Sequence, residues 1–97
     1  MYIVASIWKL VPGKEAEAQA LGLKMRDLLR STDGVQSLTQ FEIGPGERMV
    51  VMGYRDEATY QKIIQDPNGV FNKALADLNL ESVMTWVQSW RGPSMDD

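Results

Sequence analysis

The feature that most constrains this chain is a set of strand-like segments that are apolar on both faces. The first, residues 2–11 (YIVASIWKLV), has largely apolar side chains at both its even and its odd positions. Residues 49–54 (MVVMGY) and 80–91 repeat this pattern. A strand with two apolar faces needs cover on both sides of its sheet. We therefore expect the first strand to be central, with packed layers on both sides.

Two segments change to a helical period. In residues 14–31, apolar side chains recur three and four positions apart, and Gly34 is predicted in the left-handed conformation that ends helices. Asp56 is predicted to cap a second helix. The run DPNG at 66–69 interrupts it, and Asp66 before Pro67 predicts a new cap with proline at the first helical position. The second helix is thus expected in two short pieces.

A hairpin lies between the two helical segments. Residues 35–43 alternate between polar and apolar side chains, and residues 49–54 return as its partner strand. Gly44-Pro45-Gly46 joins them, with proline and glycine at the central positions of a type II turn. The glycines do not form a phosphate-binding loop, because neither the lysine nor the helix of such a loop follows them.

The segment VMTWVQSW, residues 83–90, places Trp86 and Trp90 four positions apart, which fits one face of a helix or of a strand. Three β-branched residues at alternate positions favour a strand. Polar Gln88 and Ser89 also break a helical apolar stripe. We expect a strand over residues 80–91, with both indoles on the same face.

The order strand, helix, strand, strand, helix, strand predicts a fold of class α+β. It is the ferredoxin-like βαββαβ pattern, with a four-stranded antiparallel sheet and two helices on one face. The other face would then expose a large apolar patch, which a second copy of the same sheet is best shaped to cover. We therefore expect a homodimer joined sheet to sheet into an α+β barrel. Residues 1–92 should form the single domain, and residues 93–97 a flexible tail.

The composition excludes several kinds of site and partner. The chain has no cysteine, which excludes disulfides and thiol nucleophiles, and no histidine, the commonest general base and metal ligand. Its net charge of −3 argues against a nucleic-acid partner. No stretch approaches the roughly 20 apolar residues of a membrane span, and no signal peptide is visible. We expect a soluble cytoplasmic protein with no metal site and no nucleic-acid or membrane partner.

Over residues 2–92 the chain resembles the dimeric α+β barrel superfamily, in particular the antibiotic biosynthesis monooxygenase type. The resemblance is carried by YIVASIWKLVPGK, STDGV, MVVMGYRDEATYQKIIQ and the broken helix DPNGVFNKALADL. It implies a pocket between the sheet and the helices of each subunit. The family's third strand commonly carries Glu-x-Trp, and here the matching residues are Met52-Gly53-Tyr54. The family's histidines are also absent, so a haem-degrading role is not expected.

The resemblance implies which residues line this pocket. Tyr54 and Ser6 are the candidate catalytic residues. The candidate substrate-binding residues are Trp8, Met52, Asn68, Phe71, Asn72, Met84, Trp86 and Trp90. Most of them have a structural alternative. The tryptophans can fill the core or the dimer barrel, and the methionines can fill the core. Ser6 can be satisfied by the backbone, Tyr54 can be a cross-strand aromatic with its hydroxyl at the edge, and the asparagines can cap or turn the chain. Arg55 is expected either to hold an anionic ligand group or to form a salt bridge across the dimer.

Two functions remain open. The first is a cofactor-independent monooxygenase that oxidises a small electron-rich aromatic, such as a phenol, an anthrone or a quinol. In the chemistry of the family the deprotonated substrate itself reduces oxygen, so no cofactor is expected. The alternative is a non-catalytic dimeric barrel that binds a small apolar metabolite or serves as an assembly module. The sequence names neither the ligand nor a protein partner.

Overall fold

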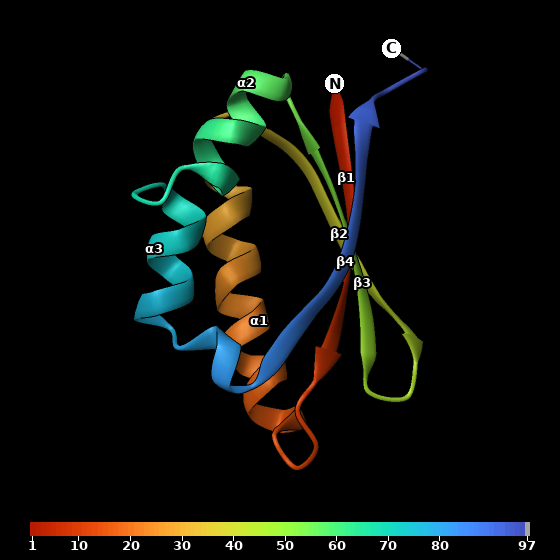
Figure 1. Ribbon diagram of the computed structural model, residues 1–97, viewed down its shortest axis with the longest axis vertical. Coiled ribbons are helices and arrows are strands. Elements are labelled where there is room, and N and C mark those ends of the chain that lie inside the picture. Colours follow the sequence, from red (N-terminus) through yellow and green to blue (C-terminus); the bar gives the residue numbers. More distant parts are fainter. Residues whose placement is uncertain (97) are drawn as a thin grey trace.

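A computed structural model describes residues 1–96 and contains one four-stranded antiparallel sheet with helices against one of its faces (Figure 1). The strands are β1 (Tyr2–Leu10), β2 (Val35–Gly44), β3 (Glu47–Tyr54) and β4 (Met84–Pro93), in the order β2-β3-β1-β4. The helical elements are α1 (Glu15–Arg30), α2 (Glu57–Tyr60), the π-helix η1 (Gln61–Gln65), α3 (Val70–Asp77) and the 3-10 turn η2 (Leu80–Ser82). The predicted ferredoxin-like arrangement is confirmed, with β1 and β3 at the centre of the sheet.

Some of the predicted turns and caps are confirmed in geometry. Gly34 has the predicted positive φ, +95°, but it does not end α1, which ends at Arg30 with Ser31 as its cap. Gly46, between β2 and β3, has φ of +72°. Both lie in the left-handed region, where glycine carries no Cβ penalty. Asp56 caps α2, since its carboxylate accepts hydrogen bonds from the Thr59 amide at 2.8 Å and the Thr59 hydroxyl at 2.7 Å. These bonds hold the pKa of the Asp56 carboxyl below its usual range.

The break in the second helix is confirmed, but its predicted register is wrong. The cap of α3 is Gly69 and not Asp66. The Asp66 carboxylate accepts from the Asn68 amide at 2.9 Å, and the Asp66 carbonyl accepts from the Gly69 amide at 2.9 Å. Asp66 therefore closes a turn, and α3 begins only after that turn at Val70.

The last strand differs from its prediction in its first residue and in the sheet face on which Trp90 lies. Residues 80–82 form η2, so β4 begins at Met84. The register of β4 on β1 shifts between Trp8 and Ile7: Trp86 pairs with Trp8, whereas Ser89 pairs with Ser6 and Trp90 with Ala5. Val87 is the extra residue of this β-bulge. The bulge puts the two indoles on opposite faces, so the expectation that they share a face is wrong.

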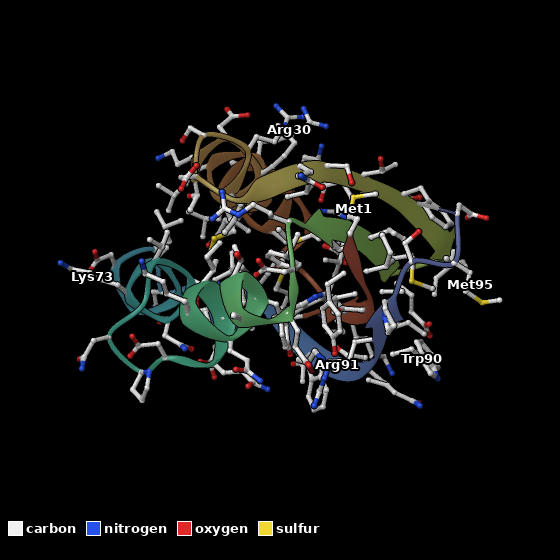
Figure 2. The ribbon with its side chains drawn as sticks, turned by 90° about the horizontal axis from the view of Figure 1, so that it is seen from above. Met1, Arg30, Lys73, Trp90, Arg91 and Met95 are labelled. Carbon is white, nitrogen blue, oxygen red and sulfur yellow. The ribbon has the colours of Figure 1, made fainter. Side chains whose placement is uncertain are left out.

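The two faces of the sheet differ in cover. Helices α1, α2 and α3 all lie on one side of it (Figure 1), and the buried core lies between them and the sheet. On the other face, exposed apolar side chains include those of Phe41, Ile43 and Trp90. In Figure 2, Trp90 lies on the side of β4 away from the helices. None of the helices within residues 1–96 is both long and apolar enough to cross a membrane.

The start of β1 and the end of β4 lie side by side at the same end of the sheet (Figure 1), where Tyr2 pairs with Pro93. Pro93 is the last residue of β4, and the Ser94 amide donates a hydrogen bond to the Met1 carbonyl at 2.7 Å. Backbone pairing therefore continues into the segment 93–97 that was predicted as a flexible tail. Asp97, the last residue of that segment, lies outside the described residues.

Candidate functional site

A cavity of about 580 Å³ lies between the sheet and the helices. This volume is in the range of about 300–1,000 Å³ that is typical of small-molecule sites. All four strands contribute helix-facing side chains to it: Val4, Ser6, Trp8, Leu38, Gln40, Arg48, Val50, Met52, Tyr54, Met84, Trp86, Ser89 and Arg91. The opposite wall comes from the helical elements, chiefly Gly22, Met25, Arg26, Leu29, Tyr60, Ile64, Phe71, Leu75, Leu80 and Glu81. The cavity is therefore a largely apolar space with a few polar groups.

Most of the residues predicted for the pocket line this one cavity. They are Ser6, Trp8, Met52, Tyr54, Phe71, Met84 and Trp86. They come together because strand alternation sends the even positions of β1 and β3 to the helix side, while α3 covers them. Their contact with a ligand stays a prediction, but their shared location makes it possible.

Three of the predicted binding residues do not line this cavity, so their predicted placement is wrong. Trp90 is on the uncovered face, because of the bulge at Val87. The side-chain amide of Asn72 donates hydrogen bonds to the backbone carbonyls of Ile64 at 2.8 Å and Asp66 at 2.9 Å, so it caps the end of η1. Asn68 is exposed in the turn before α3. Both asparagines thus form the turn and the cap at the helix break, which was the structural alternative for them.

Two serines and an indole form a polar strip across β1 and β4. The Ser6 and Ser89 hydroxyls share a hydrogen bond of 2.7 Å, and the Trp86 indole N–H donates to the Ser89 hydroxyl at 2.8 Å. A serine becomes a nucleophile when an adjacent base takes its proton. Within residues 1–96 the hydrogen-bond partners of the two hydroxyls are one another and the indole. This strip is therefore suited to orient a polar atom of a ligand and not to attack it.

Tyr54 is the most deeply buried aromatic of the cavity wall, with 1% of its surface exposed. Its hydroxyl donates to the Met52 sulfur at 3.2 Å, and its ring meets that of Tyr60 edge-on with centroids 5.4 Å apart. Burial, and secondarily the neighbouring Tyr60, raises the pKa of the Tyr54 phenol far above its usual range. The phenol is therefore protonated at neutral pH and is no general base.

The sequence prediction missed Arg48, the one charged residue that is buried in this wall. Arg48 is 7% exposed, and its guanidinium donates to the Gln19 side-chain oxygen of α1 at 2.8 Å. The third strand was predicted to start at Met49, which left Arg48 in the turn. The alternation of Val50, Met52 and Tyr54 extends back to position 48 and could have placed it on the helix side.

Arg55, for which the sequence left an anionic ligand or a dimer salt bridge open, forms an ion pair within the chain. It is exposed, and its guanidinium lies 3.7 Å from the Asp33 carboxylate. It does not line the cavity, whereas Arg48, Arg26 and Arg91 do. Within residues 1–96 no group of three or more acidic side chains is placed to hold a metal ion.

Solved structures share this fold over nearly the whole chain. SnoaB, a cofactor-independent oxygenase from Streptomyces nogalater, is 11% identical, with a TM-score of 0.77 over 99% of this chain and 94% of its own. A candidate antibiotic biosynthesis monooxygenase from Deinococcus radiodurans is 13% identical, with a TM-score of 0.77 over 100% of this chain and 95% of its own. A protein of unknown function from Nitrosomonas europaea is 18% identical, with a TM-score of 0.77 over 99% and 90%.

No protein-family model and no curated protein sequence matches the chain. The structural likeness confirms the resemblance at the level of the fold, which is that of the antibiotic biosynthesis monooxygenases.

Proposed function

We propose that this chain is a cofactor-independent oxygenase that oxidises a small electron-rich aromatic in the cavity between its sheet and its helices. The observation that carries the proposal is the cavity itself, which combines apolar and aromatic walls with the Ser6–Ser89 hydroxyl strip. A flat apolar ring gains from burial against such walls, and a ring oxygen gains a hydrogen-bond partner. A neighbour of the same fold is named a cofactor-independent oxygenase.

The proposed reaction balances without a bound cofactor. When the methylene group of an anthrone becomes a carbonyl, its carbon loses four electrons and one molecule of oxygen takes them up. One oxygen atom enters the carbonyl, and the other leaves as water with the two hydrogens of the methylene. The substrate must first lose a proton to become a reductant of oxygen. The protein then has to hold the substrate anion, exclude bulk water and orient the ring.

A second candidate function is favoured by the state of Tyr54. Because its phenol stays protonated, and because Ser6 and Ser89 bond to each other, neither predicted catalytic residue is placed to remove the substrate proton. Glu81 is the single carboxylate among the residues that line the cavity. A barrel that binds an aromatic metabolite without changing it needs no general base to remove a substrate proton.

The uncovered face of the sheet supports a homodimer in either function. Phe41 is 51% exposed there, and Ile43 and Trp90 extend the same face. Phe41 and Ile43 lie on β2 and Trp90 lies on β4, at the two edges of the sheet. Apolar side chains exposed across an uncovered sheet indicate a contact surface. A second copy related by a two-fold axis would bury it and close the barrel. Light scattering at micromolar concentration should give twice the mass of the 10.9 kDa chain.

Oxygen uptake separates the two functions. A panel of anthrones and hydroquinones is incubated with the wild-type protein after treatment with a chelator and desalting. The oxygenase should consume one oxygen per substrate and place one labelled atom from ¹⁸O₂ in the product. Trp8→Ala, which removes a cavity wall, should slow uptake, whereas Arg55→Gln should not. Tight binding of an aromatic without uptake would favour the non-catalytic barrel.

A further inference from the structure

The cavity contains a buried cation that has no acidic partner in the described part of the chain. Arg48 is 7% exposed, and its side chain donates a hydrogen bond to Gln19, a neutral amide. Glu42, its register partner on β2, is exposed and forms no ion pair with it. Arginine is rarely buried to this extent unless it is paired, because its charge loses hydration.

Part of the Arg48 guanidinium remains available from the cavity. No side-chain nitrogen or oxygen in residues 1–96 is fully buried without a partner. The guanidinium nitrogens that Gln19 does not bind therefore keep some accessible surface, and Arg48 lines the cavity. A guanidinium has five N–H donors in a planar fork that matches the two oxygens of a carboxylate.

Gly22, a residue that is unfavourable inside a helix, lies against Arg48. Gly22 lies in the middle of α1, where glycine weakens a helix. A Cβ at position 22 would lie 3.2 Å from the Nη1 atom of Arg48. The absent side chain thus leaves room for the guanidinium under α1. Gly22 lowers the stability of α1, and the buried charge of Arg48 lowers the stability of the fold. Two such unfavourable features in contact at a cavity are typical of a functional site.

The charge of the cavity wall is opposite to that of the whole chain. Arg26, Arg48 and Arg91 line it with one acidic residue, Glu81, although the chain has a net charge of −3. Arg26 is bound to Asp27 at 2.9 Å, and the Arg91 guanidinium lies 5.6 Å from the centre of the Tyr60 ring. Arg48 is the buried member of the three, and within residues 1–96 it has neither an ion pair nor an aromatic ring as partner.

We infer that the ligand is an aromatic molecule with one anionic oxygen group, a carboxylate or an ionised phenol, and that this group binds Arg48. Trp8, the register partner of Arg48 on β1, then lies beside the ring. This inference deepens the proposed function by naming the class of its substrate, and it rests on that function only in using the same cavity. An ionised phenol bound there would also enter the oxygen reaction already deprotonated.

The test compares a carboxylate with its neutral isostere. Calorimetry measures the affinity of 2-naphthoate and of 2-naphthamide for the wild type, Arg48→Gln and Arg55→Gln. Wild type and Arg55→Gln should prefer naphthoate by about 10- to 100-fold, the range of a charge-assisted hydrogen bond. Arg48→Gln should bind both ligands about equally. No preference in the wild type, or a preference that survives in Arg48→Gln, would overturn the inference.

Two further measurements keep the test decisive. Arg48→Met is a second neutral variant of similar length, and should also lose the preference if Arg48→Gln fails to fold. The yellow ionised form of 4-nitrophenol distinguishes the two sources of the anion, because binding as phenolate should increase its absorbance near its ionisation midpoint in wild type and not in Arg48→Gln. A naphthoate preference without this increase would assign the site to carboxylates.

The outcome is separable from that of the proposed function. Binding is measured without turnover, so a naphthoate preference that depends on Arg48 supports the inference even if no substrate consumes oxygen. Conversely, oxygen uptake from neutral anthrones at equal rates in wild type and Arg48→Gln, with no naphthoate preference, would support the oxygenase and overturn the anionic ligand.

Discussion

Trp86 and Trp90 lie four residues apart on β4 but on opposite faces of the sheet. Trp86 pairs with Trp8 on the cavity side, and Trp90 pairs with Ala5 on the uncovered side. The extra residue at Val87 causes the switch. The two indoles are similarly exposed, at 55% and 49%, so they form a matched pair that distinguishes the cavity from the proposed dimer surface.

Trp90→Ala should weaken the proposed dimer, whereas Trp86→Ala should leave it intact. A tryptophan that is buried in an interface can contribute about 2 kcal/mol or more, so we expect the dimer dissociation constant to rise about 30-fold or more in Trp90→Ala. Sedimentation velocity over a dilution series measures it. For naphthoate affinity the order should reverse, since only Trp86 lines the cavity. Dissociation by Trp86→Ala and not by Trp90→Ala would contradict this assignment of faces.

Arg48→Met should make the folded protein more stable. The substitution removes a buried charge with no acidic partner and keeps the apolar stem of the side chain, while Gln19 is exposed and can bond to water. Replacing buried ionic groups by apolar ones often stabilises a protein by about 1–4 kcal/mol, and we expect the low end of that range. Urea unfolding measures the difference. A loss of stability would show that Arg48 serves the fold and not a ligand.

Gly22→Ala should stabilise α1 more when Arg48 is shortened. Alanine gains about 1 kcal/mol over glycine inside a helix. In the wild type part of this gain is lost, because the new Cβ would lie 3.2 Å from Arg48 Nη1. In an Arg48→Gln background the contact is absent, so the full gain should appear. A double-mutant cycle by urea unfolding tests this, and equal gains in both backgrounds would mean that the guanidinium moves aside without cost.

Tyr54→Phe should change the alkaline stability of the protein but not its stability at neutral pH. Burial raises the pKa of Tyr54, so the folded chain holds this proton more tightly than the unfolded chain. The resulting stabilisation is complete below about pH 10 and is lost as the pH rises above that value. Unfolding free energies measured from about pH 9 to pH 11 should therefore fall more steeply in wild type than in Tyr54→Phe.

At pH 7 the same variant should lose less than about 1 kcal/mol, because the methionine sulfur that accepts the Tyr54 hydroxyl is a weak acceptor. Oxygen uptake, where present, should keep its pH profile in Tyr54→Phe. A profile that loses a limb in this variant would restore Tyr54 as the general base.

Local sequence rules predicted what local interactions control. Gly46 takes the positive φ of its turn, Asp56 caps α2, and the alternation of β1 places Val4, Ser6 and Trp8 on one face. The double-faced apolar strands and their order then leave the ferredoxin-like sheet as the natural fold. In each case the physical cause lies within a few residues of the feature that it explains.

Only the tertiary structure decided on which face of the sheet Trp90 lies and that Arg48 is buried in the cavity wall. A β-bulge is set by the pairing of β4 with β1, residues that lie some 80 positions apart, and one inserted residue moves every later side chain to the other face. The burial of Arg48 depends likewise on α1, where Gly22 leaves space for its guanidinium. The sequence by itself therefore determined the order and type of the elements and most of the cavity wall, because these follow from local periodicity. Contacts between distant segments decided that Trp90 faces away from the cavity and that Arg48 is buried in its wall.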